Sequence, residues 1–223
     1  METESQPFRQ MTVAGFVGHL ASSAPVPGGG SASAVAAALG ASLVAMVAAL
    51  SAGRPKYAQH EATHATAGAI GRELSDRFLA LADEDSQAYA GFSAALKMAK
   101  ETEPERTARS AALQSAARVA AEVPLACVEA CRELVLAAEM LAGRSNANAS
   151  SDLAVASLLG EAAARGAAAN VLVNLPSVGD EPYAVTMTSR VERLLAEITA
   201  SGAALRDVVA SGVARDPLPA SNT

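Results

Sequence analysis

Apolar residues recur along the chain with the spacing of helices, and stretches that alternate apolar and polar residues as strands do are scarce. Residues 11–21 place their apolar side chains on one face, which predicts a short amphipathic helix. Residues 31–52 are almost entirely apolar or small, which is typical of a helix buried on all sides. A longer amphipathic pattern covers residues 56 to about 100, and Gly53 and Pro55 separate it from the apolar helix.

The second half of the chain predicts three further helices joined by polar or proline-containing connections. They cover about residues 103–143, 153–173 and 182–211. Pro104 suits the first turn of the first of these helices, whereas Pro124 should kink or break it. We expect the tail RDPLPASNT, residues 215–223, to be frayed.

This pattern predicts an all-α fold class: a bundle of about six or seven helices, two or three of them long, around a buried alanine-rich central helix. With 223 residues the chain is long enough for one domain with a substantial core. Since no repeat or linker divides it, we expect a single domain over residues 1–223 with a core at about 10–212. Aromatic residues make up only 3% of the chain, so close contacts between helices with small side chains should dominate the packing.

The net charge of −6 argues against nucleic acid as a partner, because binding phosphate requires a basic face. A membrane span is an alternative to weigh, because residues 11–53 contain no Asp, Glu, Lys or Arg and residues 31–53 are long enough to cross a bilayer. That segment is mostly Ala, Ser and Gly, which gain little from lipid, so we interpret it as a central core helix with no membrane contact. The N-terminus lacks the basic start of a signal peptide, and we expect a cytoplasmic protein.

Two residue pairs at helical spacing could suggest redox or metal chemistry. Cys127 and Cys131 lie one turn apart without a CxxC motif, which favours buried structural thiols. His60 and His64 have the spacing of a helical metal pair, but no HExxH motif or clear third ligand accompanies them. We therefore expect surface histidines and no metal site.

The segment SAPVPGGGSASA places three glycines immediately before the apolar helix. Gly28, Gly29 and Gly30 would leave the first backbone N–H groups of that helix uncovered, where the helix dipole adds partial positive charge. Such a helix end can bind an anion or a carbonyl oxygen of a ligand. The alternative is a tightly packed helix start that is capped by Ser31.

A second polar segment, GRSNANASSD, covers residues 143–152 before another helix. Ser150 or Ser151 could cap this helix, and Asp152 would lie favourably against its dipole. Asn146 and Asn148 are ordinary turn residues. The functional alternative is a set of amide and hydroxyl groups that recognise a polar heterocycle.

A carboxylate and two aromatic residues share one face of the long helix at 56–100. Asp85, Tyr89 and Phe92 are spaced i, i+4 and i+7. Most acidic runs on helices are solvated, but a carboxylate on the aromatic side would lose water. Its pKa would then be raised toward the range that suits proton transfer.

Four segments in this order resemble the cyclodeaminase/cyclohydrolase family of folate enzymes, over roughly residues 10–212. They are PVPGGGSASAVAAALGASLVAMVAALSAG, DEDSQAYAGF, AAEVPLACVEAC and NANASSDLAVASLLGEAAARGAAANVLVNLPSV. The resemblance implies an all-helical, cytoplasmic and usually homodimeric enzyme. It also implies a tetrahydrofolate derivative with a one-carbon unit as substrate, no metal and no permanently bound cofactor.

The resemblance also implies roles for individual residues, with Asp85 as the catalytic acid and base. The implied substrate-binding residues are Gly28, Gly29, Gly30, Ser31, Arg54, Lys56, Tyr57, Tyr89, Asn146, Asn148, Ser151 and Asp152. Arg54 and Lys56, with Arg144, retain some of the positive charge that the anionic glutamate tail of folate needs. Leu172 and Pro176 stand where the family often has basic residues, which leaves weak tail binding or a different substrate open.

Two reactions are consistent with the resemblance. The first interpretation is formiminotetrahydrofolate cyclodeaminase, which converts 5-formimino-tetrahydrofolate to 5,10-methenyl-tetrahydrofolate and ammonia. The alternative is methenyltetrahydrofolate cyclohydrolase, which adds water to the 5,10-methenyl compound and forms 10-formyl-tetrahydrofolate. A non-catalytic helical folate-binding or scaffold protein is an alternative of another class.

Overall fold

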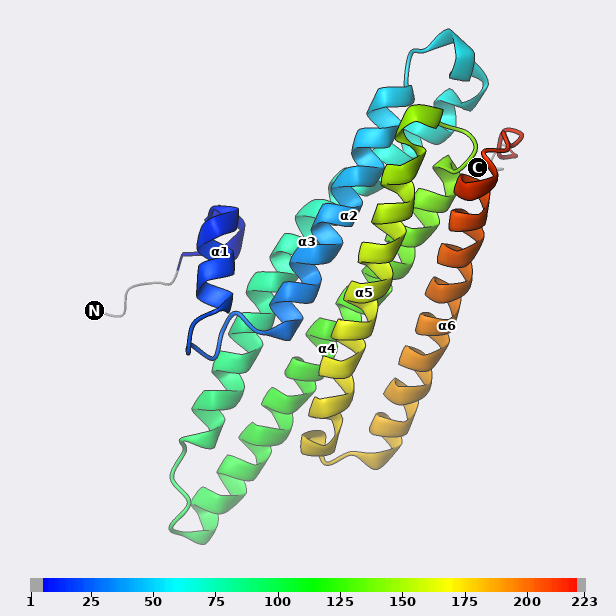
Figure 1. Cartoon of the computed structure of the whole chain (residues 1–223). Coiled ribbons are helices and arrows are strands. Elements are labelled where there is room, and N and C mark those ends of the chain that lie inside the picture. Colours follow the sequence, from blue (N-terminus) through cyan, green and yellow to red (C-terminus); the bar gives the residue numbers. More distant parts are fainter. Residues whose placement is uncertain (1–5, 220–223) are drawn as a thin grey trace.

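The computed structural model describes residues 6–219 and confirms the all-α prediction, with no strand in that range (Figure 1). Six α-helices are present in the described residues, and five of them exceed 20 residues, which is more long helices than the sequence suggested. The α-helices are α1 (Val13–Leu20), α2 (Gly29–Ser51), α3 (Glu61–Leu96), α4 (Glu103–Leu141), α5 (Ser150–Asn174) and α6 (Glu181–Ser211). Short 3-10 turns are η1 (Phe8–Gln10), η2 (Pro55–His60), η3 (Ala147–Ala149) and η4 (Leu175–Val178).

The five long helices run up and down beside one another (Figure 1). Helix α2 packs between α3 and α5, while α4 packs against α3, α5 and α6. Successive long helices are antiparallel, and α1 stands beside the bundle near the start of α2 (Figure 1). The end of α2 therefore lies near one end of the bundle, whereas its start lies partway along, because α3 and α4 extend beyond it (Figure 1).

Small residues bring the central helices close together, as the composition predicts. Ala37, Ala41 and Val44 on α2 are fully buried. A Cβ atom added at Gly71 of α3 would lie 2.8 Å from the backbone oxygen of Ala41, so glycine is needed where these helices meet. Bulkier side chains such as Phe78 fill the remaining core.

Helix α4 is continuous through Pro124, so the prediction of a break there is wrong. Proline has no N–H to donate to the carbonyl four residues earlier, which is that of Ala120. The side chain of Asn174 on α5 supplies the missing donor, with its Nδ2 2.9 Å from the Ala120 oxygen. A contact between two helices thus compensates for the proline.

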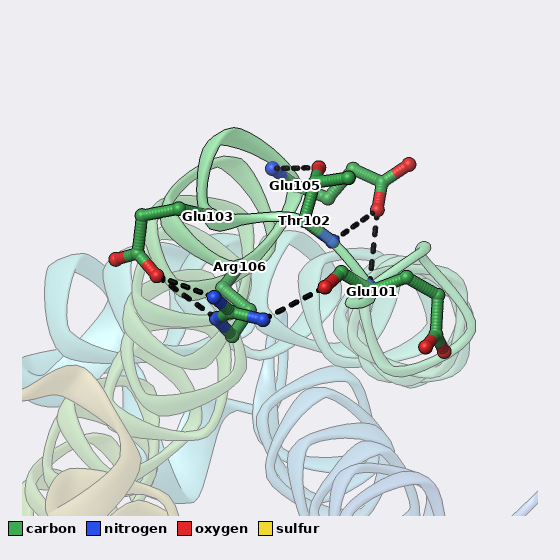
Figure 2. A network of polar contacts seen from close by, with 5 residues as sticks. All are labelled: Glu101, Thr102, Glu103, Glu105 and Arg106. Carbon is green, nitrogen blue, oxygen red and sulfur yellow. Dashed lines mark hydrogen bonds and ion pairs between the residues drawn. The ribbon is translucent and has the colours of Figure 1, made fainter.

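The connection between α3 and α4 ends in a capping box (Figure 2). The Thr102 hydroxyl accepts from the backbone N–H of Glu105, and the Glu105 carboxylate accepts from the backbone N–H groups of Thr102 and Glu101. Arg106 pairs with Glu103 and also donates to the Glu101 carbonyl. These contacts satisfy the first donors of α4 and fix the start of the helix.

The paired cysteines and histidines both lie in the interior. Cys127 and Cys131 are buried, as expected. His60 and His64 are buried as well, with 3% and 2% of their surface exposed, so the expectation of surface histidines is wrong. The Nε2 of His64 lies 2.9 Å from the carbonyl oxygen of Arg144, and this contact with the α4–α5 loop explains why the side chain is held inside.

The C-terminal tail is attached to the bundle as far as residue 216, which corrects the expectation of fraying there. The backbone N–H of Arg215 donates to the Gly143 carbonyl at 2.9 Å, and the Arg144 side chain donates to the Asp216 carbonyl at 2.6 Å. Arg215 also pairs with Glu139. Residues 220–223 lie outside the described range.

Helix α2 is long and apolar enough to cross a membrane by length and composition. Half of its most apolar stretch is buried inside the bundle, where it packs on α3 and α5. A core helix of a soluble protein has the same properties.

Candidate functional site

The start of α2 meets a carboxylate from another helix. Gly28 is the N-cap residue and has no side chain to accept from the first N–H groups. Asp85 on α3 lies against this helix start: the Ser31 hydroxyl donates to its Oδ2 at 2.8 Å and lies 3.2 Å from the Ala82 carbonyl. The alternative that Ser31 caps the helix is therefore wrong, since its hydroxyl holds the Asp85 carboxylate instead.

Gly30 is the point where the backbone of α2 meets this carboxylate. A Cβ atom at Gly30 would lie 2.6 Å from Cγ of Asp85 and 2.7 Å from its Oδ2, which is closer than real Cβ contacts come. At Gly29 the nearest atom to an added Cβ would be Nδ2 of Asn170, at an ordinary 3.7 Å. Close approach of Asp85 thus requires glycine at position 30 but not at position 29.

The glycine turn and Asp85 line a cavity of about 260 Å³. Residues that line it come from the α1–α2 connection and from α2, α3, α4 and α5. They are Pro25, Val26, Gly28, Gly29, Gly30, Asp85, Ala88, Tyr89, Phe92, Ala120, Asn170, Val173 and Asn174. Its volume is slightly below the ~300–1,000 Å³ of typical ligand sites, so it suits a ring system rather than a whole elongated ligand.

Desolvation raises the pKa of Asp85 above the ordinary value of an aspartate. Hydrogen bonds from the Ser31 hydroxyl and backbone N–H act in the opposite direction, because they stabilise the ionised form. Desolvation is the larger influence. The side chain is half-buried and open to the cavity, as a group that exchanges a proton with a ligand must be.

The predicted face of α3 is confirmed, since Asp85, Tyr89 and Phe92 all line the cavity. Tyr89 is 44% exposed and lies at the mouth rather than in the interior. The aromatic rings offer a flat apolar wall beside the carboxylate, and such a wall suits a planar heterocycle.

Two asparagines of α5 were missed by sequence reasoning. Asn170 and Asn174 both line the cavity, and the amide of Asn170 lies beside Gly29. Their signal was present in the sequence: two amides at i and i+4 stand in the otherwise apolar run NVLVN, on one face of a helix. Their spacing could have identified a polar stripe facing the interior.

The remaining predicted site residues gather at the other end of α2. Helix α2 has 23 residues and is therefore about 34 Å long, which separates its two ends. The residues of this second cluster are Arg54, Lys56, Tyr57, Asn146, Asn148, Ser151 and Asp152. The structure brings them together with one another, but not with Asp85.

Two side chains of this second cluster, Tyr57 and Asn146, hydrogen-bond with nearby backbone, whereas its exposed cations Arg54 and Lys56 make no ion pair among the described residues. The Tyr57 hydroxyl accepts from the backbone N–H of Ala147 at 3.1 Å, and the Ser51 hydroxyl accepts from that of Asn146 at 2.8 Å. The Asn146 side chain accepts from the N–H of Asn148 at 3.2 Å. No side-chain bond caps α5, whose N-cap is Ala149, so the predicted serine cap is wrong.

A metal site finds no support in the described residues. Among residues 6–219, no three His, Cys, Asp or Glu side chains converge as a metal would need. The chemistry that the cavity offers is proton transfer by Asp85, with backbone N–H groups and side-chain amides as hydrogen-bonding partners.

Comparison with known proteins identifies relatives along nearly the whole chain. Residues 12–193 match the family model described as formiminotransferase-cyclodeaminase. A methenyltetrahydrofolate cyclohydrolase from Methylorubrum extorquens is 38% identical over 202 residues, which are 91% of this chain and 97% of that protein. The formimidoyltransferase-cyclodeaminase of Gallus gallus is 35% identical over 182 residues, but this match covers only 34% of that longer protein.

A solved structure agrees with the sequence relatives. The crystal structure of formiminotetrahydrofolate cyclodeaminase from Thermotoga maritima matches with a TM-score of 0.82 at 26% identity. The match covers 91% of this chain and 98% of that one. Because the family model spans most of the residues and relatives match at over 30% identity, the chain belongs to the formiminotransferase-cyclodeaminase family.

Proposed function

We propose that the protein is a methenyltetrahydrofolate cyclohydrolase, which converts 5,10-methenyl-tetrahydrofolate and water to 10-formyl-tetrahydrofolate. The observation that carries the proposal is the desolvated Asp85 carboxylate at the glycine turn of a cavity sized for a ring system. The relative from Methylorubrum extorquens supports this reaction, because that match extends over nearly the full length of both proteins. The cyclohydrolase is therefore our first interpretation and the cyclodeaminase our second, whereas the sequence alone favoured the opposite order.

The charges around the cavity suit the substrate. The methenyl bridge between N5 and N10 is a delocalised cation. The cavity is lined by one carboxylate, and none of its lining residues is Lys, Arg or His. A cation beside Asp85 would stabilise the ionised carboxylate and lower its pKa again, so binding the substrate would help to prepare the base.

In the proposed reaction Asp85 acts first as base and then as acid. Its carboxylate takes a proton from a water molecule as the oxygen attacks the methenyl carbon, and a neutral carbinolamine forms. The carbon–N5 bond then breaks as N5 receives the proton from Asp85, and the carbinol hydroxyl gives its proton to the freed carboxylate as the C=O bond forms. The formyl group stays on N10, and Asp85 releases the remaining proton to solvent. General acid–base help of this kind is typically worth about 10²–10⁴-fold.

Formiminotetrahydrofolate cyclodeaminase is the second candidate, favoured by the match to the Thermotoga maritima structure over nearly its whole length. Here N10 attacks the formimino carbon, Asp85 removes the N10 proton, and the departing nitrogen leaves as ammonia after it is protonated. The same carboxylate and the same cavity serve both reactions, because both pass through a tetrahedral carbon that is bonded to N5, to N10 and to either a hydroxyl or an amino group.

Two absorbance assays test the proposal. Loss of the methenyl absorbance of 5,10-methenyl-tetrahydrofolate, faster than the uncatalysed rate, is expected. Appearance of that absorbance from 5-formimino-tetrahydrofolate, together with ammonia release, would instead support the cyclodeaminase. Binding of both compounds without turnover would support a non-catalytic folate-binding protein and contradict the proposal.

We also propose a homodimer. The outward side of α2 and α5 carries exposed apolar side chains, and no charged residue occurs on α2. The exposed residues on this face are Leu39, Met46, Leu50, Val155 and Leu158. A second copy would cover this face, and a monomeric mass by light scattering at micromolar concentration would contradict it.

The proposed dimer determines whether Arg54 and Lys56 can bind the anionic tail of the substrate. Arg54 and Lys56 lie about 34 Å from the cavity of their own chain, at the far end of α2. Within one chain they are too distant to bind the tail of a folate whose ring is beside Asp85. Their proposed role in substrate binding therefore requires the second copy.

We propose further that the protein acts in the cytoplasm, without membrane or nucleic acid partners and without a permanently bound cofactor. The negative net charge supports the absence of a nucleic acid partner, and the burial of half of the apolar stretch of α2 supports the absence of a membrane partner. The proposed reaction requires only proton transfer by a carboxylate, which supports the absence of a bound cofactor.

A further inference from the structure

A proline-induced defect in α4 determines the orientation of an amide in the cavity. Pro124 leaves the Ala120 carbonyl without a donor in its own helix. Asn174 on α5 donates to that carbonyl through Nδ2 at 2.9 Å. Both Ala120 and Asn174 line the cavity, so this contact forms part of its wall.

The second N–H of the Asn174 amide is also used. It donates to the backbone carbonyl of Asn170, one turn earlier on α5, at 2.9 Å. Both partners of Nδ2 are carbonyl oxygens, which only accept, so the amide cannot be turned around without losing both bonds. The free group of Asn174 is consequently its Oδ1, a hydrogen-bond acceptor with a fixed orientation.

The polar groups of the cavity follow one another from Asp85 to Asn174. Asp85 lies against Gly30, and the amide of Asn170 lies beside Gly29. Asn174 is one helical turn beyond Asn170, about 6 Å further along α5. A ring whose reacting edge lies at Asp85 would therefore present its opposite edge to Asn174.

We propose that Oδ1 of Asn174 accepts a hydrogen bond from the 2-amino group of the pterin ring, and that Pro124 is the positioning residue that fixes this acceptor. The inference rests on the proposed function, because it takes the one-carbon unit to lie beside Asp85. The 2-amino group is the donor on the side of the ring that lies far from N5. A heterocycle with an acceptor at that place would leave Oδ1 unpaired, which gives the site its specificity.

Three variants separate binding from folding. Asn174→Ala removes the acceptor but also leaves the Ala120 carbonyl without a donor, which should destabilise the fold. Pro124→Ala supplies a backbone N–H that can bond Ala120 within α4. The double variant Pro124→Ala/Asn174→Ala therefore lacks the acceptor without an orphaned carbonyl, and Pro124→Ala alone is its matched control.

The measurement compares two ligands: a folate and its analogue in which hydrogen replaces the 2-amino group. Dissociation constants are measured by titration calorimetry, and midpoints of thermal unfolding are measured alongside. We expect wild type to bind the 2-amino compound about tenfold more tightly, the worth of a typical hydrogen bond. The double variant should bind both compounds equally. It should also regain the stability that Asn174→Ala loses. Pro124→Ala should show a reduced preference for the 2-amino compound.

The outcomes distinguish this inference from the proposed function. A double variant that keeps the wild-type preference would overturn the role of Asn174, and an unchanged preference in Pro124→Ala would overturn the positioning role of Pro124. Stability that the double variant fails to regain would contradict the carbonyl argument. Failure of the wild-type protein to bind or convert any tetrahydrofolate would instead overturn the proposed function itself.

Discussion

The two ends of helix α2 look alike in the sequence and differ in the structure. Each is flanked by glycine, proline and polar residues, and each was predicted to bind substrate. At the first end, Gly30 brings the helix against Asp85, whose carboxylate is desolvated and open to a cavity. At the second end, the hydroxyls of Ser51 and Tyr57 accept from the backbone of the α4–α5 loop.

This difference distinguishes a candidate binding site from a loop whose polar groups stabilise the fold. The hydroxyls of Ser51 and Tyr57 and the amide of Asn146 have their hydrogen bonds completed within the protein, so they hold the loop and have little left for a ligand. The exposed cations Arg54 and Lys56 are not paired in this way, which leaves them available to a second copy. A group that is desolvated and remains accessible is available for chemistry. The sequence reports polarity at both ends of α2, but it does not report which polar groups are already paired.

The substitution with the largest expected effect removes the Asp85 carboxylate at the first end of α2. Asp85→Asn keeps the shape of the side chain but cannot take a proton, so we expect turnover to fall by about 10²–10⁴-fold. Because burial raises the pKa of Asp85, the folded state holds its proton more tightly than the unfolded state. Its contribution to stability is therefore present at low pH and lost as the pH rises through the raised pKa.

It follows that Asp85→Asn should be at least as stable as wild type at neutral pH, by chemical denaturation. A variant that is unfolded would mean that the carboxylate is chiefly a cap for α2. A folded variant with full turnover would exclude Asp85 from the mechanism.

The next effect concerns the two glycines beside the carboxylate. Gly30→Ala would press a methyl group against Asp85 and displace it, and a shift of about 1 Å can cost about 10²-fold in rate. Gly29→Ala makes only an ordinary contact with Asn170, and we expect turnover within about threefold of wild type. Steady-state rates with circular dichroism as the folding control would decide, and equal losses at both positions would contradict the geometry.

A smaller effect should appear in the pH dependence. The Ser31 hydroxyl stabilises the ionised form of Asp85, so Ser31→Ala should raise the pKa of Asp85 further. As a base, Asp85 must be ionised in the free enzyme, and kcat/KM falls as the pH drops through its pKa. The acid limb of the pH–rate profile should therefore move to higher pH in Ser31→Ala, whereas a limb that moves to lower pH or stays in place would contradict this role.

Much of the fold and half of the site could be predicted from local sequence. Helical periodicity located the long helices, and the spacing of Asp85, Tyr89 and Phe92 placed them on one face that does line the cavity. These predictions succeed because they depend only on the geometry of one helix.

The failures depend on contacts between elements. Pro124 was expected to kink or break α4, but the helix continues through it and a donor from Asn174 compensates for its missing N–H. His64 was expected at the surface, but the carbonyl of Arg144 holds it inside. In each case the partner lies at least 50 residues away in the chain, and no local pattern indicates the pairing.

The smallest expected effect on activity comes from the second end of α2. Ser51 is fully buried, and its hydroxyl accepts from the backbone N–H of Asn146 while donating to the Val47 carbonyl. Ser51→Ala leaves the buried N–H of Asn146 without that partner, at a cost of about 1–3 kcal/mol in the free energy of unfolding. The cavity is about 34 Å away, so kcat/KM should stay within about twofold of wild type. Chemical denaturation and the methenyl assay on one preparation would measure both quantities, and a large loss of turnover at unchanged stability would show that the second end contributes directly to the reaction.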